Sequence, residues 1–226
     1  MERLHLKLQE INNVIKKEIS KENDIGILDG LSGIALFQFY YSKFLDSEKI
    51  HDDALITLKK CFEKINNGYW LPPFCSGIAG FGWTLVHLVK NNFIELDNDE
   101  ILSGFDEYIH NVMVFSLNKK NFDFLHGGIG YALYFIQRYK NTLSEALKIG
   151  YKVKIYEFIS LLDSFADKTS NQYKWEKVSN GERVYDLSLS HGISSIIGIL
   201  NKLYEFPEFR ESVKGILLGA INYIIE

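Results

Sequence analysis

Leu125-His-Gly-Gly-Ile-Gly-Tyr-Ala-Leu133 is one of four similar stretches in which small residues, mostly glycine, open a run of apolar residues. The other three are Leu28-Asp-Gly-Leu-Ser-Gly-Ile-Ala-Leu36, Cys75-Ser-Gly-Ile-Ala-Gly-Phe-Gly-Trp83 and Ser190-His-Gly-Ile-Ser-Ser-Ile-Ile-Gly198. Their leading glycines, Gly30, Gly77, Gly127 and Gly192, are 47, 50 and 65 residues apart. Because a period of about 20 to 50 residues is typical of repeat architectures, we expect four copies of one unit, with an insertion before the last.

Amphipathic stretches alternate with these apolar runs, and both are helical in pattern. Apolar residues recur at i, i+3, i+4 and i+7 in five stretches that carry charge on one side, which predicts outer helices over 4–19, 54–65, 101–117, 155–165 and 213–225. Four other stretches are apolar on most sides and predict inner helices over 34–44, 81–89, 131–139 and 196–204. A leading glycine opens each inner helix, and a second one three positions later allows close approach of a neighbour. The chain is therefore predicted to be all-α, built of helical hairpins.

The insertion, residues 168–186, is the polar exception. Its stretch from Tyr173 to Tyr185 has room for a hairpin closed by Asn180-Gly181. It is rich in polar residues and also holds Trp175. The insertion is therefore interpreted either as a lid that contacts a peptide or as a surface loop.

Composition and charge exclude several classes of protein. The 226 residues are 46% hydrophobic and carry a net charge of −4, which fits one folded domain and argues against a nucleic-acid partner. The charged N-terminus and the lack of a long apolar stretch argue against a signal peptide and a membrane span, and favour a cytoplasmic protein. Only Cys61 and Cys75 are present, so no disulfide framework or zinc knuckle is indicated.

The repeat motifs resemble those of a known family. Asp29-Gly-Leu-Ser-Gly33, Ser76-Gly-Ile-Ala-Gly80, Asp123-Phe-Leu-His-Gly127 and Ser190-His-Gly-Ile-Ser194 look like the first four of the seven Gly-x-x-Gly repeats of lanthionine synthetase C-like proteins. The resemblance implies an α/α toroid, with inner helices ringed by outer ones and the active site at the inner-helix N-termini. Residues 1–226 are then expected to form a single toroid-type domain that is incomplete, either as the N-terminal part of a longer seven-repeat domain or as a natural partial toroid. The chain stops at Tyr223-Ile-Ile-Glu226 without a capping glycine, which agrees with that expectation.

The same resemblance implies a reaction and two catalytic residues, Asp123 and His191. The family closes thioether rings by adding a cysteine thiol of a dehydrated precursor peptide to dehydroalanine or dehydrobutyrine, as in lantibiotic biosynthesis. The expected partners are that peptide and either a dehydratase or the missing C-terminal repeats. His191 precedes a helix-starting glycine, where the helix dipole favours a neutral imidazole able to accept a proton. Asp123 would orient this histidine or help to protonate the product.

Zinc is expected for the family, but its ligands are not in this sequence. The Trp-Cys-x-Gly and Cys-His-Gly motifs that would bind it do not occur in the 226 residues, so no metal ligand is assigned and the chain alone is expected to be inactive. A competing hypothesis places Cys75, His126 and His191 at one rim as three metal ligands, although structural zinc sites take four.

Alternatives remain open. Asp123 and His191 would also serve as a helix-capping residue and a structural histidine. The whole chain would then be a catalytically silent peptide-binding scaffold of the same fold. A third hypothesis is a glycoside hydrolase with an α/α-toroid fold. Such an enzyme requires two carboxylates at the site, and Asp29 and Asp123 are the candidates at the inner-helix N-termini.

Overall fold

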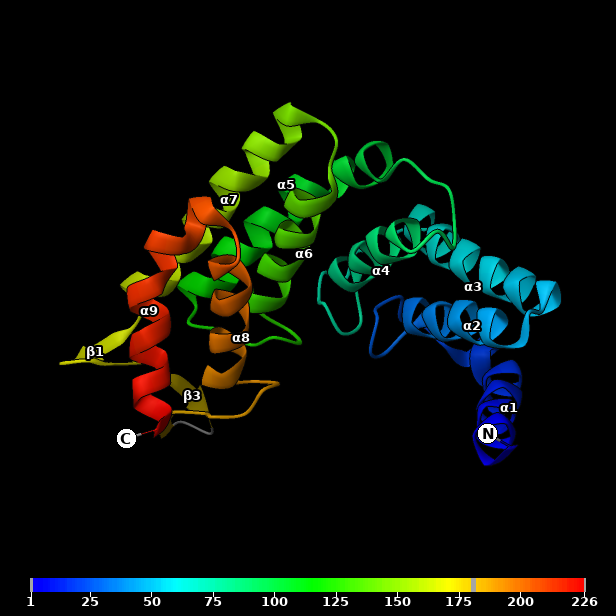
Figure 1. The fold of residues 1–226 in the computed structure, drawn as a ribbon, viewed down its shortest axis with the longest axis horizontal. Helices are drawn as coiled ribbons and strands as arrows, with labels where there is room; N and C mark the ends of the chain where they lie inside the picture. The colour runs from blue at the N-terminus through cyan, green and yellow to red at the C-terminus, as the bar shows by residue number, and fades with distance from the viewer. Residues whose placement is uncertain (1, 180–181, 226) are drawn as a thin grey trace. The chain divides into compact units, whose positions relative to one another are not determined.

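The computed structural model describes residues 2–179 and 182–225, and nine α-helices account for most of them. These residues group into two compact units, Met1–Leu96 and Asp97–Glu226, each described here by itself (Figure 1). The prediction of one domain over residues 1–226 stays a prediction.

The first unit contains four α-helices. They are α1 (Glu2–Glu18), α2 (Leu31–Leu45), α3 (Glu48–Asn66) and α4 (Ile78–Lys90), with the short 3-10 helix η1 (Ile19–Lys21) after α1. Helices α2 and α3 form a hairpin, and α4 packs on α2. The chain entering α2 makes a single β-bridge between Ile25 and Gly30.

The second unit continues the pattern with five helices. They are α5 (Asn98–Asn118), α6 (Gly128–Asn141), α7 (Glu145–Ser164), α8 (Ile193–Tyr204) and α9 (Pro207–Ile225). Helices α6 and α7 form one hairpin, α8 and α9 form another, and α6 also contacts α8 (Figure 1). No helix in the described ranges has both the length and the apolar character needed to cross a membrane.

The predicted alternation of outer and inner helices is confirmed. Each of the four inner helices, α2, α4, α6 and α8, begins directly after its leading glycine. Eleven of the fourteen residues of α6 are buried, whereas the outer helix α1 buries only Asn12. The burial difference follows the sequence pattern, since an apolar surface on all sides needs neighbours on all sides.

All four repeats enter the inner helix through the same turn. The residue after the leading glycine donates its N–H to the carbonyl seven positions earlier, in the pairs Leu31 to Asp24 (3.0 Å), Ile78 to Leu71 (2.9 Å), Gly128 to Asn121 (3.0 Å) and Ile193 to Asp186 (2.7 Å). The turn presses backbone onto the glycine: a Cβ at Gly77 would lie 2.1 Å from Leu71 O, and one at Gly192 would lie 2.0 Å from Asp186 O. Gly30 adds a φ of 147°, which side chains rarely adopt. Glycine is thus required by close packing of the loop.

The second glycine also serves this loop. A Cβ at Gly33 would lie 2.1 Å from Ile27 O, and one at Gly80 would lie 2.0 Å from Phe74 O. The close neighbour that the sequence predicts is therefore the entry loop of the same repeat.

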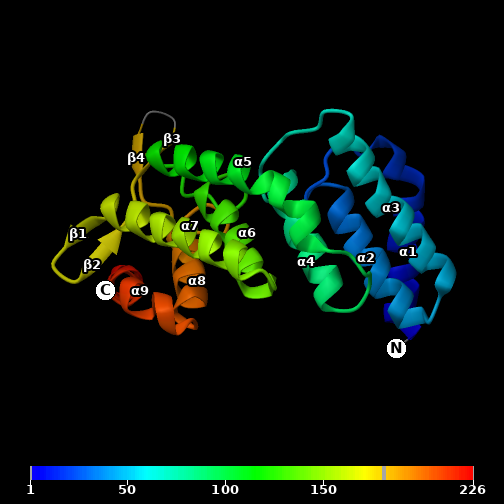
Figure 2. The ribbon, with the colours of Figure 1, turned by 90° about the horizontal axis from the view of Figure 1, so that it is seen from above.

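The insertion forms two small antiparallel hairpins. Strands β1 (Asp167–Thr169) and β2 (Gln172–Lys174) pair with Lys168 opposite Tyr173, and β3 (Lys177–Ser179) pairs with β4 (Glu182–Val184). The second pair lies at the C-terminal end of α5 (Figure 2), where Glu176 forms an ion pair with Lys120 at 4.0 Å. The predicted Asn180-Gly181 turn falls outside the described residues. Trp175 is only 3% exposed and donates its Nε1–H to Leu162 O at 2.8 Å, so it anchors the insertion to α7.

A buried polar cluster joins α5, α6 and α7. Arg138 of α6 is 1% exposed and forms ion pairs with Asp99 (3.2 Å) and Asp106 (3.5 Å) of α5. The two carboxylate oxygens of Asp106 accept hydrogen bonds from the hydroxyls of Tyr134 and Tyr151, both at 2.6 Å. These ion pairs and hydrogen bonds join side chains of three helices in the buried interior, so they fix how the three helices of this unit meet.

Candidate functional site

Asp123 lies in the loop between α5 and α6, in the third repeat, and is held by its own turn. Its Oδ1 accepts the backbone N–H groups of Leu125 (2.7 Å) and His126 (2.8 Å), and its own N–H donates to Asn121 Oδ1 at 3.2 Å. A carboxylate that accepts hydrogen bonds two and three residues ahead stabilises a tight turn. Asp123 therefore stabilises its own turn and does not cap α6, whose N-cap is Gly127 without a side-chain hydrogen bond, and the turn engages only one of the two carboxylate oxygens.

His191 lies in the corresponding loop of the fourth repeat, directly before Gly192 and α8. The backbone N–H of His191 donates to Ser188 Oγ at 3.1 Å, and Ser188 in turn donates its N–H to Asp186 Oδ1 at 2.7 Å. The loop is thus fixed through backbone and short side chains, and the imidazole projects from it.

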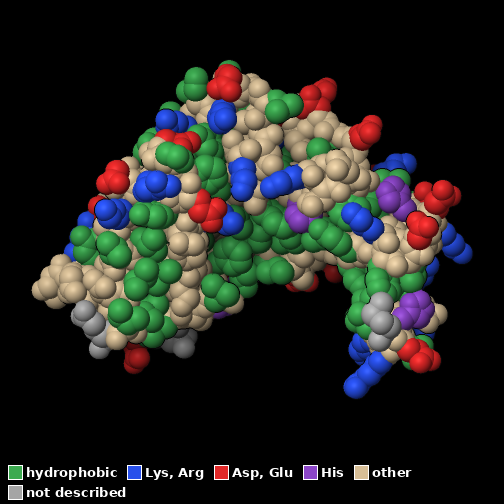
Figure 3. Space-filling view, viewed as in Figure 1, with side chains coloured by type: hydrophobic (Ala, Val, Ile, Leu, Met, Phe, Trp, Pro, Cys, Tyr) green, Lys and Arg blue, Asp and Glu red, His purple; other side chains and the backbone are tan. Residues whose placement is uncertain are grey.

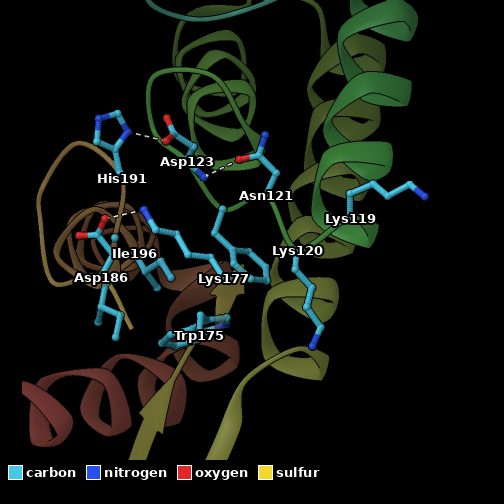
Figure 4. A pocket seen from close by; sticks show the side chains of 12 residues that line it. Lys119, Lys120, Asn121, Asp123, Trp175, Lys177, Asp186, His191 and Ile196 are labelled. Carbon is cyan, nitrogen blue, oxygen red and sulfur yellow. Dashed lines mark hydrogen bonds and ion pairs between the residues drawn. The ribbon is translucent and has the colours of Figure 1, made fainter. Parts of the chain in front are cut away.

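The two loops bring Asp123 and His191 together. His191 Nδ1 lies 2.5 Å from Asp123 Oδ2, although the residues are 68 positions apart (Figure 4). The loops are also joined through backbone, because Phe124 donates its N–H to Ser190 O at 3.2 Å. The His191 side chain is 43% exposed and that of Asp123 is 18% exposed, so the pair is open to solvent on the histidine side.

This arrangement selects one tautomer of His191. A carboxylate oxygen accepts hydrogen bonds, so the proton between the two groups belongs to Nδ1, and Nε2 carries the lone pair. A histidine held in this way by a carboxylate is a competent proton acceptor and, once protonated, a proton donor.

The pair lines a pocket of about 280 Å³, which we call the polar pocket because charged side chains gather in it, although apolar side chains, Trp175 among them, also line it (Figure 4). Its other charged residues are Lys119, Lys120, Lys177 and Asp186. Lys177 of β3 forms an ion pair with Asp186 at 2.5 Å, and this lysine, with hydrogen bonds from Ser188, lowers the pKa of Asp186 to about 2. The insertion therefore reaches the site through Lys177.

The other sequence candidates are placed as follows. Asp29 and Cys75 lie in the first unit, where Cys75 is buried and Asp29 is exposed. His126 is exposed in the Asp123 loop. Among residues 2–179 and 182–225, no group of three or more His, Cys, Asp or Glu side chains is arranged to hold a metal ion, which does not support the three-ligand hypothesis.

Comparison with known proteins identifies the family. The family model described as "Lanthionine synthetase C-like protein" matches residues 21–225. The chain belongs to the lanthionine synthetase C-like family. Among solved structures, this lanthionine synthetase C-like chain is similar to one described as "Nisin cyclase", with a TM-score of 0.65 and 18% sequence identity over 96% of the chain. The predicted all-α fold of the α/α toroid type is thereby confirmed. The match covers 57% of the nisin cyclase chain, and the comparison with curated proteins gives no match.

Sequence reasoning missed Lys177 and Asp186. The sequence pattern marks Asp186 only as the end of the insertion. Asp186 nevertheless stands six residues before Gly192, as Asn121 does before Gly127 and Asp24 before Gly30. A polar residue recurring at this position is a signal that aligning the repeats backwards from the glycine would have found.

Proposed function

We propose that this chain carries the proton-transfer residues of a thioether-forming peptide cyclase. The reaction adds the thiol of a peptide cysteine across the double bond of a dehydroalanine or dehydrobutyrine in a dehydrated, ribosomally made precursor peptide, as in lantibiotic biosynthesis. The observation that supports it is the 2.5 Å contact between His191 Nδ1 and Asp123 Oδ2 at the edge of a pocket. These are the two positions to which the family resemblance assigns catalytic groups.

His191 acts as the proton shuttle in this proposal. Its Nε2 accepts the proton of the thiol, and the sulfur then bonds to the β-carbon while the π electrons move to the α-carbon and its carbonyl. The resulting enolate takes the proton back from Nε2 at the α-carbon, so the imidazole ends as it began. Asp123 acts on His191 as a positioning residue, since it holds the Nδ1 tautomer and stabilises the imidazolium formed between the two steps.

Zinc does not fit the described residues. The family's metal lowers the pKa of the thiol, but the sequence lacks both family zinc motifs and the described side chains offer no ligand group. No step of the proposal therefore runs through a metal. We propose that the zinc-binding repeats belong to a longer seven-repeat domain of which these residues form the N-terminal part.

The test measures ring closure under conditions in which the thiol needs a base. A synthetic peptide with one dehydroalanine and one cysteine is incubated with the full chain at about pH 7.5, below the ordinary cysteine pKa of about 8.5, so that most of the thiol is protonated. Cyclisation is followed by mass spectrometry after alkylation of the remaining thiols. We expect acceleration over the protein-free reaction, and a loss of about 10²- to 10⁴-fold of that acceleration in His191→Ala.

His126→Ala is the matched control, because His126 stands directly before Gly127 as His191 stands directly before Gly192. It should close rings at the wild-type rate. Peptide binding without any acceleration would instead establish the silent scaffold, and an equal loss in both variants would remove the specific role of His191.

A further inference from the structure

A second pocket, mostly apolar, lies beside the His191 and Asp123 loops. We call it the apolar pocket; it has a volume of about 270 Å³ and lies between α6 and α8. Leu133 of α6 and Ile199 of α8 form its walls, and Phe124 and Leu189 close it from the two loops. Among the described residues that line it, Lys202 alone is charged. On the face shown in Figure 3, hydrophobic side chains gather where α6 and α8 lie together.

Each catalytic loop supplies both pockets. Asp123 lines the polar pocket, and the next residue, Phe124, lines the apolar one. His191 lines the polar pocket, and Leu189, two residues earlier, lines the apolar one. The backbone hydrogen bond from Phe124 N–H to Ser190 O joins the two loops, so each loop keeps one residue at each pocket. A ligand engaged by His191 is therefore next to the apolar pocket as well.

The apolar pocket has unfilled room and an uncovered wall. Leu189 is 69% exposed, although hydrogen bonds fix its loop on both sides. Gly198, in the middle of α8, also lines the pocket, and a Cβ built there meets no atom within 4 Å. A volume near the lower end of known ligand sites suits a single side chain better than a whole small molecule.

An extended peptide would use both pockets at once. Successive side chains of an extended chain point to opposite sides, so a reacting residue directed at the polar pocket sends its neighbour away from it. We propose that the apolar pocket binds a leucine-like side chain of the peptide residue next to the reacting one, and so selects the ring positions that this chain accepts. The proposal rests on the peptide-cyclase function proposed above.

Two synthetic peptides test this preference. Both carry a central dehydroalanine and a fluorescent label; its two neighbours are leucine in one peptide and serine in the other. Binding to the full chain is measured by fluorescence anisotropy. We expect the leucine peptide to bind at least about tenfold more tightly, since burial of one such side chain is worth that much.

Gly198→Leu fills the apolar pocket and should remove the preference. Gly104→Leu is the matched control: Gly104 lies within α5, and a Cβ there also meets nothing within 4 Å. Both changes raise helix propensity, so both variants should fold. Equal binding of the two peptides by the wild type, or binding of neither, would overturn the proposal, as would a preference that survives Gly198→Leu.

A second pair of variants tests the contribution of the loop before α8 to the apolar pocket. Leu189→Asp should weaken binding of the leucine peptide, whereas Leu187→Asp, at a leucine that is 50% exposed in the same loop but not in the pocket, should not. Binding and ring closure separate the two proposals. A leucine preference that persists when His191→Ala has no effect on cyclisation supports the pocket and refutes the function; a missing preference with His191 required does the reverse.

Discussion

Replacing Asp123 by asparagine tests the histidine pair without changing the size of the side chain. The amide oxygen can still accept the N–H groups of Leu125 and His126, which the carboxylate accepts at 2.7 and 2.8 Å. Toward His191 the amide presents a donor in place of an acceptor, so Nδ1 must accept and the ring proton moves to Nε2. Nε2 then lacks the lone pair that takes the thiol proton.

The expected loss can be estimated from this one hydrogen bond. A hydrogen bond to a charged group contributes about 1.5–3 kcal/mol, and each 1.36 kcal/mol is tenfold in rate. His191 is 43% exposed, so water competes and the effect lies toward the lower part of that range. We therefore expect Asp123→Asn to slow ring closure by about 10- to 40-fold, less than His191→Ala does. Unfolding free energy should fall by less than about 1 kcal/mol, because the turn keeps its acceptor.

Two measurements check this estimate: ring closure by mass spectrometry and thermal unfolding by circular dichroism. The double variant of Asp123→Asn and His191→Ala should be no slower than His191→Ala alone, since residues that act as one unit are not additive. A wild-type rate in Asp123→Asn, or losses that multiply in the double variant, would refute the assignment. Early unfolding of either single variant would favour the purely structural role.

Three further predictions concern stability. Arg138→Met leaves Asp106 as a buried charge without its cation and should cost about 3–5 kcal/mol of unfolding free energy in urea titrations. Lys177, together with the hydrogen bonds from Ser188, lowers the folded-state pKa of Asp186 from 3.8 to about 2, so these contacts stabilise the fold above about pH 4 and their contribution is lost as pH falls toward 2. Lys177→Met removes the largest of these contacts, so the urea midpoint of the variant should fall less between pH 7 and pH 3 than that of the wild type. Gly192→Ala places a Cβ 2.0 Å from Asp186 O and should lower the melting temperature clearly. An unchanged melting temperature would mean that the entry turn can shift to admit the methyl group.

The helical framework was predictable because its signals are local and repeated. Each inner helix starts where a glycine precedes an apolar run, and the shared entry turn explains why these glycines recur. Helix ends were less predictable: α7 begins at Glu145, ten residues before the predicted start at Ile155, because its first turns are more polar and Ser144 caps them. Capping of this kind depends on one side chain, which periodicity does not register.

The buried cluster around Arg138 was not predictable from pattern. Arg138 lies in a stretch interpreted as an apolar inner helix, and its partners, Asp99, Asp106 and Tyr151, come from two other helices. A charged residue on an inner helix signals a partner, but the sequence does not say which of many carboxylates it meets. Long-range pairing of this kind needs the packed structure.

The catalytic candidates were predictable as residues but not as a pair. The motif resemblance singled out Asp123 and His191, and nothing in the sequence required their side chains to meet across 68 positions. They meet because α6 and α8 are neighbouring inner helices whose entry turns have the same geometry, so equivalent loops lie side by side.

The insertion then completes the site. It looks like a departure from the repeat, yet Lys177 on β3 binds Asp186, whose carbonyl closes the entry turn of α8 and whose carboxylate holds Ser188 beneath His191. Asp186 thus links the added hairpin to the shared turn and to the loop that carries His191. It follows that the insertion supports the His191 loop through Asp186, whereas Asp123 contacts the imidazole itself, and that substitutions in β3 should change the position of the imidazole more than the stability of the helices.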